Sequence, residues 1–405
     1  MNPPQKASIL HVSHNYYVAG GSDRYFLELE QLLKSQGHKV VPFCSADPSN
    51  GTTDYAKYFP ASVSMHNPSA RDAIRYVYSS AARKNITNAI AEQNPALAHL
   101  HIYYGKLTAS ILEPLCSNGI PIVQTLHEYK LLCPVYTCIS HGEICEACAG
   151  KHFWKAAVKR CNRGSLLRSI ASTTESYVSK WLGAVDKIDH FIGVSQFMTD
   201  KMLSIGIPEH KLSTVHNFVD SSQYEPAETE GEYILYFGRL EHNKGVMTLM
   251  EAMRLNPRLS CIVAGTGPAD KDMRKFITAC GMTNVDLVGF VTGDSLRNLI
   301  RGAICTVLPA EWYENCPMSI LESMALARPV IGSNIGGIPE LINPEEDGLI
   351  VDAGSTEQLA AAISRLGNDV AKSLRMGANA RAKVERDFSP ENHYKQISAV
   401  YEKLL

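Results

Sequence analysis

This sequence of 405 residues lacks the long apolar runs that place a chain in a membrane. No uninterrupted apolar stretch approaches the roughly 20 residues that cross a bilayer. Its start, MNPPQKASILHVSH, shows neither the basic stretch nor the apolar stretch of a secretory leader. We therefore expect the protein in the cytoplasm, or at the inner face of the membrane.

An excess of charge of one sign is also missing. The 39 Lys and Arg residues are balanced by 41 Asp and Glu residues, which gives a net charge of -2. Proteins that bind nucleic acid usually carry a basic surplus. The composition therefore argues against a nucleic-acid partner, and any anion site must come from a local arrangement.

Cysteine is plentiful, with 11 residues, but a long chain without a leader favours reduced thiols over disulfides. Cys145 and Cys148 have the spacing of metal ligands, and with Cys133 and Cys138 they would supply four thiolates for a structural zinc ion. Only one such pair is present, so unligated thiols are the alternative. Nothing supplies the open, histidine-rich site of a catalytic metal.

The length and the order of patterns predict two α/β domains. In the first half, a strand pattern at 8–12 leads through Gly20 and Gly21 into a helix that ends at Gly37, and a strand at 40–43 follows. Further strands are expected at 98–102, 122–126 and 191–194. The polar segment 220–231 resembles a linker.

After this linker the strand-and-glycine pattern starts again. Strands are expected at 233–237, 259–264, 285–288 and 305–308, and a helix is expected from Val246, with apolar residues at 246, 249, 250 and 253. We predict domains 1–219 and 220–388. A final helix, 389–405, has Ser389 as its cap and Pro390 as its first residue, and we expect it to return to the first domain.

The stretch 309–341 carries two glutamates around the start of an expected helix whose first residue would be Pro317. Glu314 would lie in the loop before the helix and Glu322 one to two turns inside it. Helix N-termini attract anions, so a phosphate could rest near residues 315–319. The pair predicts a site for a sugar joined to a phosphate. For Glu322 alone, a solvated helix glutamate is the plain alternative.

A pair of carboxylates also occurs in glycoside hydrolases, where both flank one bond. Eight helical residues would separate the two Cα atoms by about 12 Å along the axis, without aiming both side chains at one bond. Two binding roles therefore fit better than acid and base catalysis.

Arg239 and Lys244 lie in one loop after an expected strand, where parallel sheets gather ligands. Two cations there can neutralise a diphosphate, and their effect grows as a departing phosphate gains charge. Taken alone, both are ordinary solvated loop charges.

The order of several motifs resembles retaining glycosyltransferases of the GT-B fold, family 4. The motifs are Gly20-Gly21, His127-Glu128, Ser195, Asn217, Gly238-Arg239, Lys244-Gly245, Glu314 with Glu322, and Gly336-Gly337-Ile338-Pro339-Glu340. The resemblance spans nearly the whole chain. It implies two facing Rossmann-like, doubly wound α/β domains, an interdomain cleft that holds a UDP- or GDP-linked sugar, and no catalytic metal.

The resemblance also implies residue roles. Arg239 and Lys244 are similar to the pair that binds the donor diphosphate, Glu322 to the acid that holds the ribose, and Glu314 to the carboxylate that contacts the sugar. His127 is similar to the histidine beside the sugar and its 6-hydroxyl; the alternative is a satisfied buried imidazole.

The remaining donor-binding candidates are backbone and loop positions. They are Gly20, Gly21, Ser195, Gly238, Asn315, Cys316, Pro317 and Met318. Ser195 and Asn217 are weaker candidates because both types are common in turns and caps. Two positions depart from the family pattern: Asn315 replaces the usual glycine, and Glu128 replaces a frequent aspartate. The sugar hydroxyl that Glu314 would meet is therefore left open.

The implied reaction is front-face transfer. The leaving phosphate accepts the proton of the acceptor, and the anomeric configuration is kept. Lys244, Arg239 and the helix N-terminus would supply most of the catalysis by electrostatic stabilisation. The expected acceptor is a saccharide or a lipid-linked saccharide, in polysaccharide or glycolipid synthesis. A nucleotide-sugar epimerase and a non-catalytic nucleotide-sugar-binding protein are the alternatives.

The acceptor side is marked by basic residues between Lys151 and Lys187 that alternate with Phe153, Trp154 and Trp181. Such helices can lie on an anionic membrane, which would suit a lipid-linked acceptor. An ordinary amphipathic helix packed on the first domain is the alternative.

Overall fold

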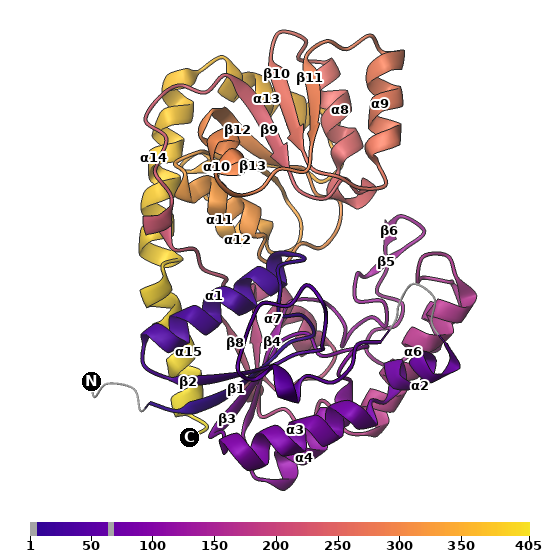
Figure 1. Ribbon diagram of the computed structural model, residues 1–405. Helices are drawn as coiled ribbons and strands as arrows, with labels where there is room; N and C mark the ends of the chain where they lie inside the picture. Colours follow the sequence, from indigo (N-terminus) through magenta and orange to yellow (C-terminus); the bar gives the residue numbers. More distant parts are fainter. Residues whose placement is uncertain (1–5, 64–68) are drawn as a thin grey trace. The chain divides into compact units, whose positions relative to one another are not determined.

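The computed structural model describes residues 6–63 and 69–405. Contacts divide the chain into two units (Figure 1). The first contains Met1–His141, Cys145–His216 and Tyr394–Leu405, and the second contains Asn217–His393 with Gly142–Ile144. We predicted divisions after residues 219 and 388, whereas the contacts divide the chain after His216 and His393.

The first unit contains a parallel sheet of six strands in the order β2-β1-β3-β4-β7-β8. The strands are β1 (Ser8–Val12), β2 (Lys39–Phe43), β3 (Leu97–Leu100), β4 (Ile122–Leu126), β7 (His190–Gly193) and β8 (Leu212–Thr214). The patterns at 8–12 and 122–126 predicted β1 and β4 to the residue. The short strand β8 was not predicted.

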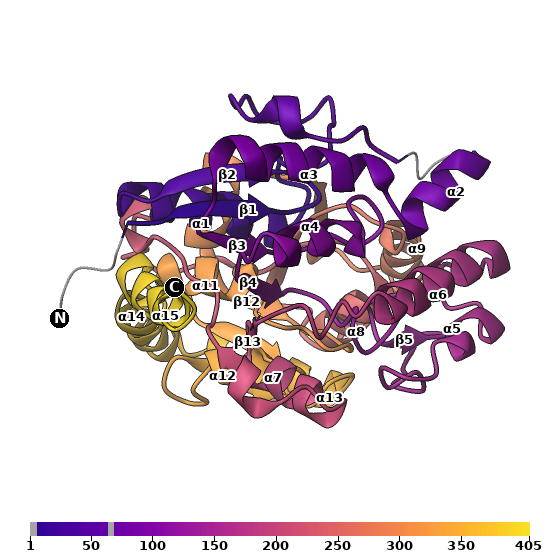
Figure 2. The ribbon, with the colours of Figure 1, turned by 90° about the horizontal axis from the view of Figure 1, so that it is seen from below.

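Helices cover this sheet and extend from it. They are α1 (Gly21–Ser35), α2 (Ala70–Val77), α3 (Ser80–Gln93), α4 (Leu112–Ser117), α5 (Trp154–Val158), α6 (Leu166–Trp181), α7 (Gln196–Ser204) and α15 (Pro390–Glu402). Two short strands, β5 (Ile139–Ser140) and β6 (Glu143–Ile144), precede α5. Helix α6 packs against both α5 and α2 (Figure 2).

The terminal helix α15 starts at Pro390, as predicted, and the Ser389 hydroxyl accepts a hydrogen bond from the N–H of Asn392 at 3.3 Å. It ends at Glu402 and not at Leu405. The Tyr401 hydroxyl is hydrogen bonded to Nδ1 of His99 at 2.7 Å, so the end of the helix is fixed to the core of the first unit.

The second unit contains another parallel sheet of six strands, in the order β11-β10-β9-β12-β13-β14. The strands are β9 (Tyr233–Phe237), β10 (Ser260–Ala264), β11 (Val285–Gly289), β12 (Ala303–Leu308), β13 (Val330–Ser333) and β14 (Gly348–Val351). The first four were predicted, and β13 and β14 were not.

Seven helices accompany the second sheet among the described residues. They are α8 (Val246–Arg254), α9 (Asp270–Ala279), α10 (Gly293–Arg301), α11 (Met318–Ala325), α12 (Ile338–Leu341), α13 (Thr356–Gly367) and α14 (Val370–Asp387). Short 3-10 turns occur in both units: η1 (Ala56–Tyr58), η2 (Ala109–Ile111), η3 (Glu209–Lys211), η4 (Ser221–Gln223) and η5 (His242–Lys244).

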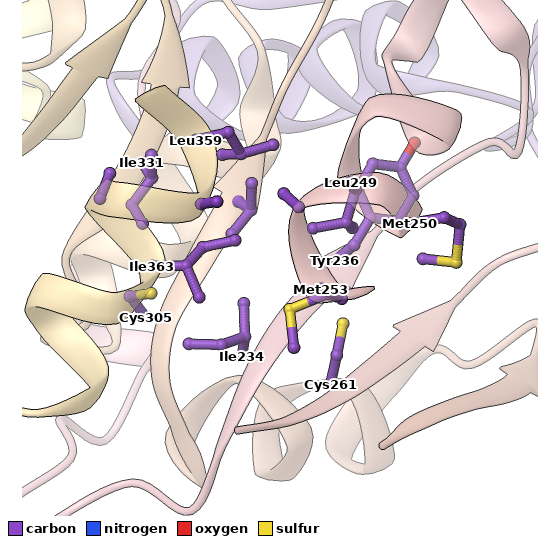
Figure 3. Packing of buried hydrophobic residues seen from close by; sticks show 14 of the residues in the cluster. Ile234, Tyr236, Leu249, Met250, Met253, Cys261, Cys305, Ile331, Leu359 and Ile363 are labelled. Carbon is purple, nitrogen blue, oxygen red and sulfur yellow. The ribbon is translucent and has the colours of Figure 1, made fainter. Parts of the chain in front are cut away.

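The core of the second unit joins β9 to α8. Tyr236 of β9 and Leu249, Met250 and Met253 of α8 are fully buried in one cluster (Figure 3). Burial of each such side chain stabilises the fold by about 1.5–3 kcal/mol. The loop between β9 and α8 is therefore held at both ends by rigid elements.

No helix in residues 6–63 or 69–405 is both long and apolar enough to span a bilayer.

Candidate functional site

The second sheet reverses its strand order between β9 and β12. From β9 the chain continues to β10 and β11 on one side, and from β12 to β13 and β14 on the other. In open parallel sheets, ligands bind where the loops leave such a pair of strands. Loop 238–245 follows β9 and loop 309–317 follows β12. The sequence candidates Gly238, Arg239, Lys244 and Glu314 to Pro317 therefore share this end of one sheet.

Two glycines allow other loops to approach loop 309–317 closely. Gly245 has φ +69°, and a Cβ there would lie 1.7 Å from the carbonyl oxygen of Pro309. Gly336 has φ +60°, and a Cβ there would lie 2.2 Å from the carbonyl oxygen of Glu314. The N–H of Gly337 donates to the same oxygen at 2.7 Å. The Gly-Gly motif thus fixes the backbone of Glu314.

Lys244 and Glu314 form an ion pair across the two loops. Their side chains are only 15% and 9% exposed. Trp312 Nε1–H donates to Glu314 Oε1 at 2.6 Å, and the Lys244 ammonium lies 5.0 Å from the centre of the Trp312 ring. Removing one partner of such a buried pair leaves an uncompensated charge. The sequence analysis gave these residues separate ligands, whereas the structure couples them directly.

Trp312 was missed by the sequence analysis. The signal was a tryptophan two residues before Glu314, in a chain with three tryptophans. A second missed contact joins the loops through the backbone, where the N–H of Glu311 donates to the carbonyl oxygen of Asn243 at 2.9 Å.

Arg239 occupies the same loop but a different environment. Its side chain is 64% exposed, and Nη1 donates to Glu241 Oε1 at 3.0 Å. Such a surface pair contributes little to stability. The guanidinium can therefore change partner at low cost.

Helix α11 differs from the prediction by one residue. It starts at Met318, and Pro317 is its N-cap with φ -67° and ψ 120°, an extended conformation outside the helix. Glu322 lies one turn inside and is buried. Asn217 Nδ2 donates to the carbonyl oxygen of Cys316 at 2.8 Å, which holds the loop before the helix. Burial raises the pKa of the Cys316 thiol to about 12, so this thiol stays protonated.

Three further candidates lie in the first unit, beside α1 and α7. Gly20 is the N-cap of α1 in an extended conformation, and Gly21 is the first residue of the helix. Ser195 caps α7: its hydroxyl accepts from the N–H of Met198 at 3.1 Å and is fully buried. The structure thus gives the Ser195 side chain a capping role.

His127 follows β4, is partly buried, and ends a column of histidines whose other members, His11 and His101, are buried. Its Nε2 lies 3.0 Å from Nδ1 of His101, and Nε2 of His101 lies 2.7 Å from Nε2 of His11. Desolvation lowers the pKa of His127 to about 4, although the Asp23 charge opposes this shift. Desolvation also holds the pKa values of His11 and His101 well below their usual range. All three rings are neutral at physiological pH.

The neighbouring Glu128 shows the opposite shift. Desolvation raises its pKa to about 7, and the Lys130 charge opposes this rise. Lys130 itself forms a buried ion pair with Glu175 at 2.6 Å.

In the part of the chain that the structure describes, one group of three metal-ligating side chains lies within 4.8 Å: His11, His99 and His101. Each of the three rings already makes at least one hydrogen bond, since Nε2 of His11 pairs with His101, and His99 pairs with Tyr401 and Thr125. The group fits a hydrogen-bond network better than a metal centre.

The cysteines of the predicted zinc site do not form such a group. Lys159 Nζ donates to Cys145 Sγ at 3.4 Å, and Cys148 packs with Phe153 and Ala156. All eleven thiols are free. The zinc prediction involving Cys133, Cys138, Cys145 and Cys148 therefore gains no support from this geometry.

Comparison with known families decides what this pair of sheets is. Residues 19–223 match the family described as Glycosyltransferase Family 4, and residues 220–383 match the family described as Glycosyl transferases group 1. The chain belongs to glycosyltransferase family 4. It is thus a glycosyltransferase that uses nucleotide sugars, as the sequence motifs predicted.

Solved structures place this family 4 enzyme in the GT-B fold. Sucrose-phosphate synthase from Thermosynechococcus elongatus is similar with a TM-score of 0.73 and 19% identity, over 98% of this chain and 99% of that one. HepE of Anabaena, in complex with UDP and glucose, is similar with a TM-score of 0.68 and 18% identity, over 98% and 99%. The predicted fold is confirmed.

Sequence relatives differ in the share of their length that aligns with this family 4 chain. Alpha-maltose-1-phosphate synthase of Mycolicibacterium smegmatis is 24% identical over 417 residues, 96% of each chain. The amylovoran biosynthesis glycosyltransferase AmsK of Erwinia amylovora is 27% identical over 225 residues, 52% of this chain and 55% of that one. The match thus spans about half the length of AmsK.

Proposed function

We propose that this enzyme is a retaining transferase that moves a hexose from a UDP- or GDP-linked donor to a saccharide or lipid-linked acceptor. The observation that carries the proposal is the meeting of Lys244 and Glu314 at the strand-order reversal of the second sheet. A lysine and a carboxylate held together there offer a cation for a diphosphate beside an acceptor for sugar hydroxyls.

The donor diphosphate is assigned to Lys244, Arg239 and the N-terminus of α11. The Lys244 ammonium is positioned by Glu314 and Trp312 before any ligand arrives, so little reorganisation is needed. Arg239 can leave its surface contact with Glu241 to complete the pairing. Glu322 is assigned to the ribose and Glu314 to the sugar.

Transfer is proposed to occur on the front face of the sugar. The bond between the anomeric carbon and the phosphate oxygen breaks, and the acceptor oxygen forms the new bond on the same face. The proton of the acceptor passes to the leaving phosphate. The cations Lys244 and Arg239 stabilise the charge on that phosphate, so the reaction needs no metal ion. His127 takes part as a neutral imidazole that hydrogen bonds to the sugar.

The relatives support a role in polysaccharide or glycolipid synthesis. They include glycosyltransferases named for amylovoran and colanic acid biosynthesis and a lipopolysaccharide core biosynthesis mannosyltransferase. One solved neighbour, HepE of Anabaena, is in complex with UDP and with UDP-glucose, which supports a UDP-linked donor over a GDP-linked one.

The test is product analysis with and without a saccharide acceptor. A transferase releases the nucleoside diphosphate and forms a glycoside only when the acceptor is present, with the anomeric configuration of the donor. An epimerase would convert the donor alone, and a binding protein would do neither. Either of the last two results overturns the proposal.

A further inference from the structure

The segment Lys151–Trp181, which forms α5 and α6, exposes an unusual number of large apolar side chains. Leu167 and Trp181 are 79% and 84% exposed. The complete set of exposed large apolar residues in this segment is Trp154, Val158, Leu166, Leu167, Ile170, Tyr177 and Trp181. We call this set the α5–α6 face. A gathering of exposed apolar side chains on one segment is typical of a contact with a membrane or a partner.

Helix α6 is oriented with its apolar side outward. Leu166, Ile170, Tyr177 and Trp181 fall within an arc of about 60° on a helix of 3.6 residues per turn. The buried side of the helix consists instead of Ser169, Ser172, Thr173, Glu175 and Ser176. A helix that only covered its own domain would do the reverse. The alternative of an ordinary packed amphipathic helix therefore does not account for α6.

The charge of this segment has one sign. It carries seven basic residues: Lys151, Lys155, Lys159, Arg160, Arg163, Arg168 and Lys180. Glu175 is its one acid, and this carboxylate is fully buried against Lys130. The neighbouring α2 adds the exposed Ile74 and two arginines, Arg71 and Arg75, which line a shallow hollow with Lys84.

We propose that the α5–α6 face rests on an anionic phospholipid bilayer. Tryptophan and tyrosine settle at the headgroup level, leucine and isoleucine enter the boundary of the acyl chains, and lysine and arginine attract anionic lipids. A second copy of this chain would carry the same positive charge on the same face, so charge favours the lipid. The proposal extends the proposed function, because a lipid-linked acceptor lies in such a surface.

Co-sedimentation of the full chain with vesicles tests the proposal. The wild type should bind vesicles that contain phosphatidylglycerol, bind pure phosphatidylcholine vesicles much less, and lose binding as salt rises. The double variant Leu167→Ser/Trp181→Ser should bind at least about tenfold more weakly, because each side chain loses its apolar burial in the lipid. The matched control is Phe290→Ser in the second unit, which removes a side chain that is 76% exposed and should leave binding unchanged.

Three results would overturn the proposal. They are equal binding to both kinds of vesicle, equal binding by wild type and double variant, and a lower oligomeric mass of the double variant, which would make the face an interface between copies. Lys159→Glu/Arg163→Glu gives a second test, since it changes charge without touching the apolar residues. Donor turnover in the absence of lipid is measured separately, so failure here leaves the proposed function standing.

The histidine column carries a second, independent inference. Nδ1 of His11 is buried and has no hydrogen-bond partner. A buried N–H without a partner costs more than a buried acceptor without one. His11 therefore carries its proton on Nε2 and donates it to Nε2 of His101. A neutral His101 then holds its proton on Nδ1 and donates to Nε2 of His127.

We infer that this relay fixes His127 with its proton on Nδ1. His101 is a positioning residue in this account, because it acts through His127. The role of an Nδ1–H donor in transfer rests on the proposed function of His127. The tautomer itself does not, since it is a property of the free protein.

Nitrogen-15 NMR of histidine-labelled protein gives the tautomer directly. We expect protonated Nδ1 on His127 in the wild type, and a protonated Nε2 would overturn the inference. In His101→Phe the fixed tautomer should be lost and kcat should fall more than the donor KM rises. His101→Asn should restore the tautomer of His127 and kcat, because the amide N–H of the asparagine replaces the Nδ1–H of His101. Failure of this rescue in a folded variant would contradict the relay.

Discussion

Acidification of the first unit gives a prediction whose size follows from the histidine column. Below pH 6.5 the unfolded chain binds a proton at His127, whereas the folded chain does so only near a pKa of about 4. The unfolded state thus binds more protons in this window, and the free energy of unfolding falls as the pH falls. Between about pH 7 and about pH 5, His127 alone lowers the free energy of unfolding by about 2 kcal/mol.

Two of its neighbours add to this effect and one opposes it. The lowered pKa values of His11 and His101 act in the same direction. Glu128 acts in the opposite direction, because its folded pKa of about 7 lies above the usual 4.5 and the folded chain takes up its proton first. Over the same range of pH, protonation of Glu128 adds about 2 kcal/mol to the free energy of unfolding and so offsets the loss from His127.

The perturbation is therefore Glu128→Gln, measured at both pH values. On acidification, the free energy of unfolding of the variant should fall by about 2 kcal/mol more than that of the wild type. Urea titrations in a Trp312→Phe background report the first unit through Trp154 and Trp181. Parallel pH dependences in the two proteins would refute the argument, and so would a Glu128→Gln protein whose stability does not fall with acid.

Three substitutions test the loops and caps. Lys244→Ala should lower the rate of transfer by about 100-fold or more. It should also destabilise the second unit by about 3–5 kcal/mol, because Glu314 is left unpaired. The double variant Lys244→Ala/Glu314→Gln should recover stability in urea titrations but not activity. Gly336→Ala places a Cβ 2.2 Å from the carbonyl oxygen of Glu314, so calorimetry should show a lower melting temperature and assays a lower kcat. Ser195→Ala should cost about 1 kcal/mol as a lost helix cap, and unchanged donor affinity by titration would confirm that the hydroxyl only caps.

The sequence predicted the strands whose short segments are rich in apolar or β-branched residues. Residues 8–12, 122–126 and 233–237 form strands to the residue, and each is a short run rich in apolar or β-branched side chains. Strands β8, β13 and β14 span three or four residues, a length at which pattern alone separates strands from loops poorly. Strands β3 and β7 are as short as β13 and β14 but were predicted. Helix α6 was expected, but the pattern did not indicate which side it buries.

The candidate site was predicted as a set of residues and not as an arrangement. Lys244 and Glu314 are 70 positions apart, and their contact depends on β9 and β12 being neighbours in the sheet. The histidine column depends in the same way on β1, β3 and β4 being adjacent. Motif order reveals the family, but pairing across strands requires the topology.

The most direct test of the central claim is calorimetric titration of UDP-glucose and of a GDP-linked hexose into the full chain. We predict that the wild type binds one of the two donors. Lys244→Ala and Glu322→Gln should each weaken that binding by at least about tenfold through loss of a charged contact. Lys275→Ala, which removes an exposed lysine of α9, should leave the binding unchanged. Wild-type affinity in Lys244→Ala would contradict the claim that loops 238–245 and 309–317 of the second unit hold the donor diphosphate.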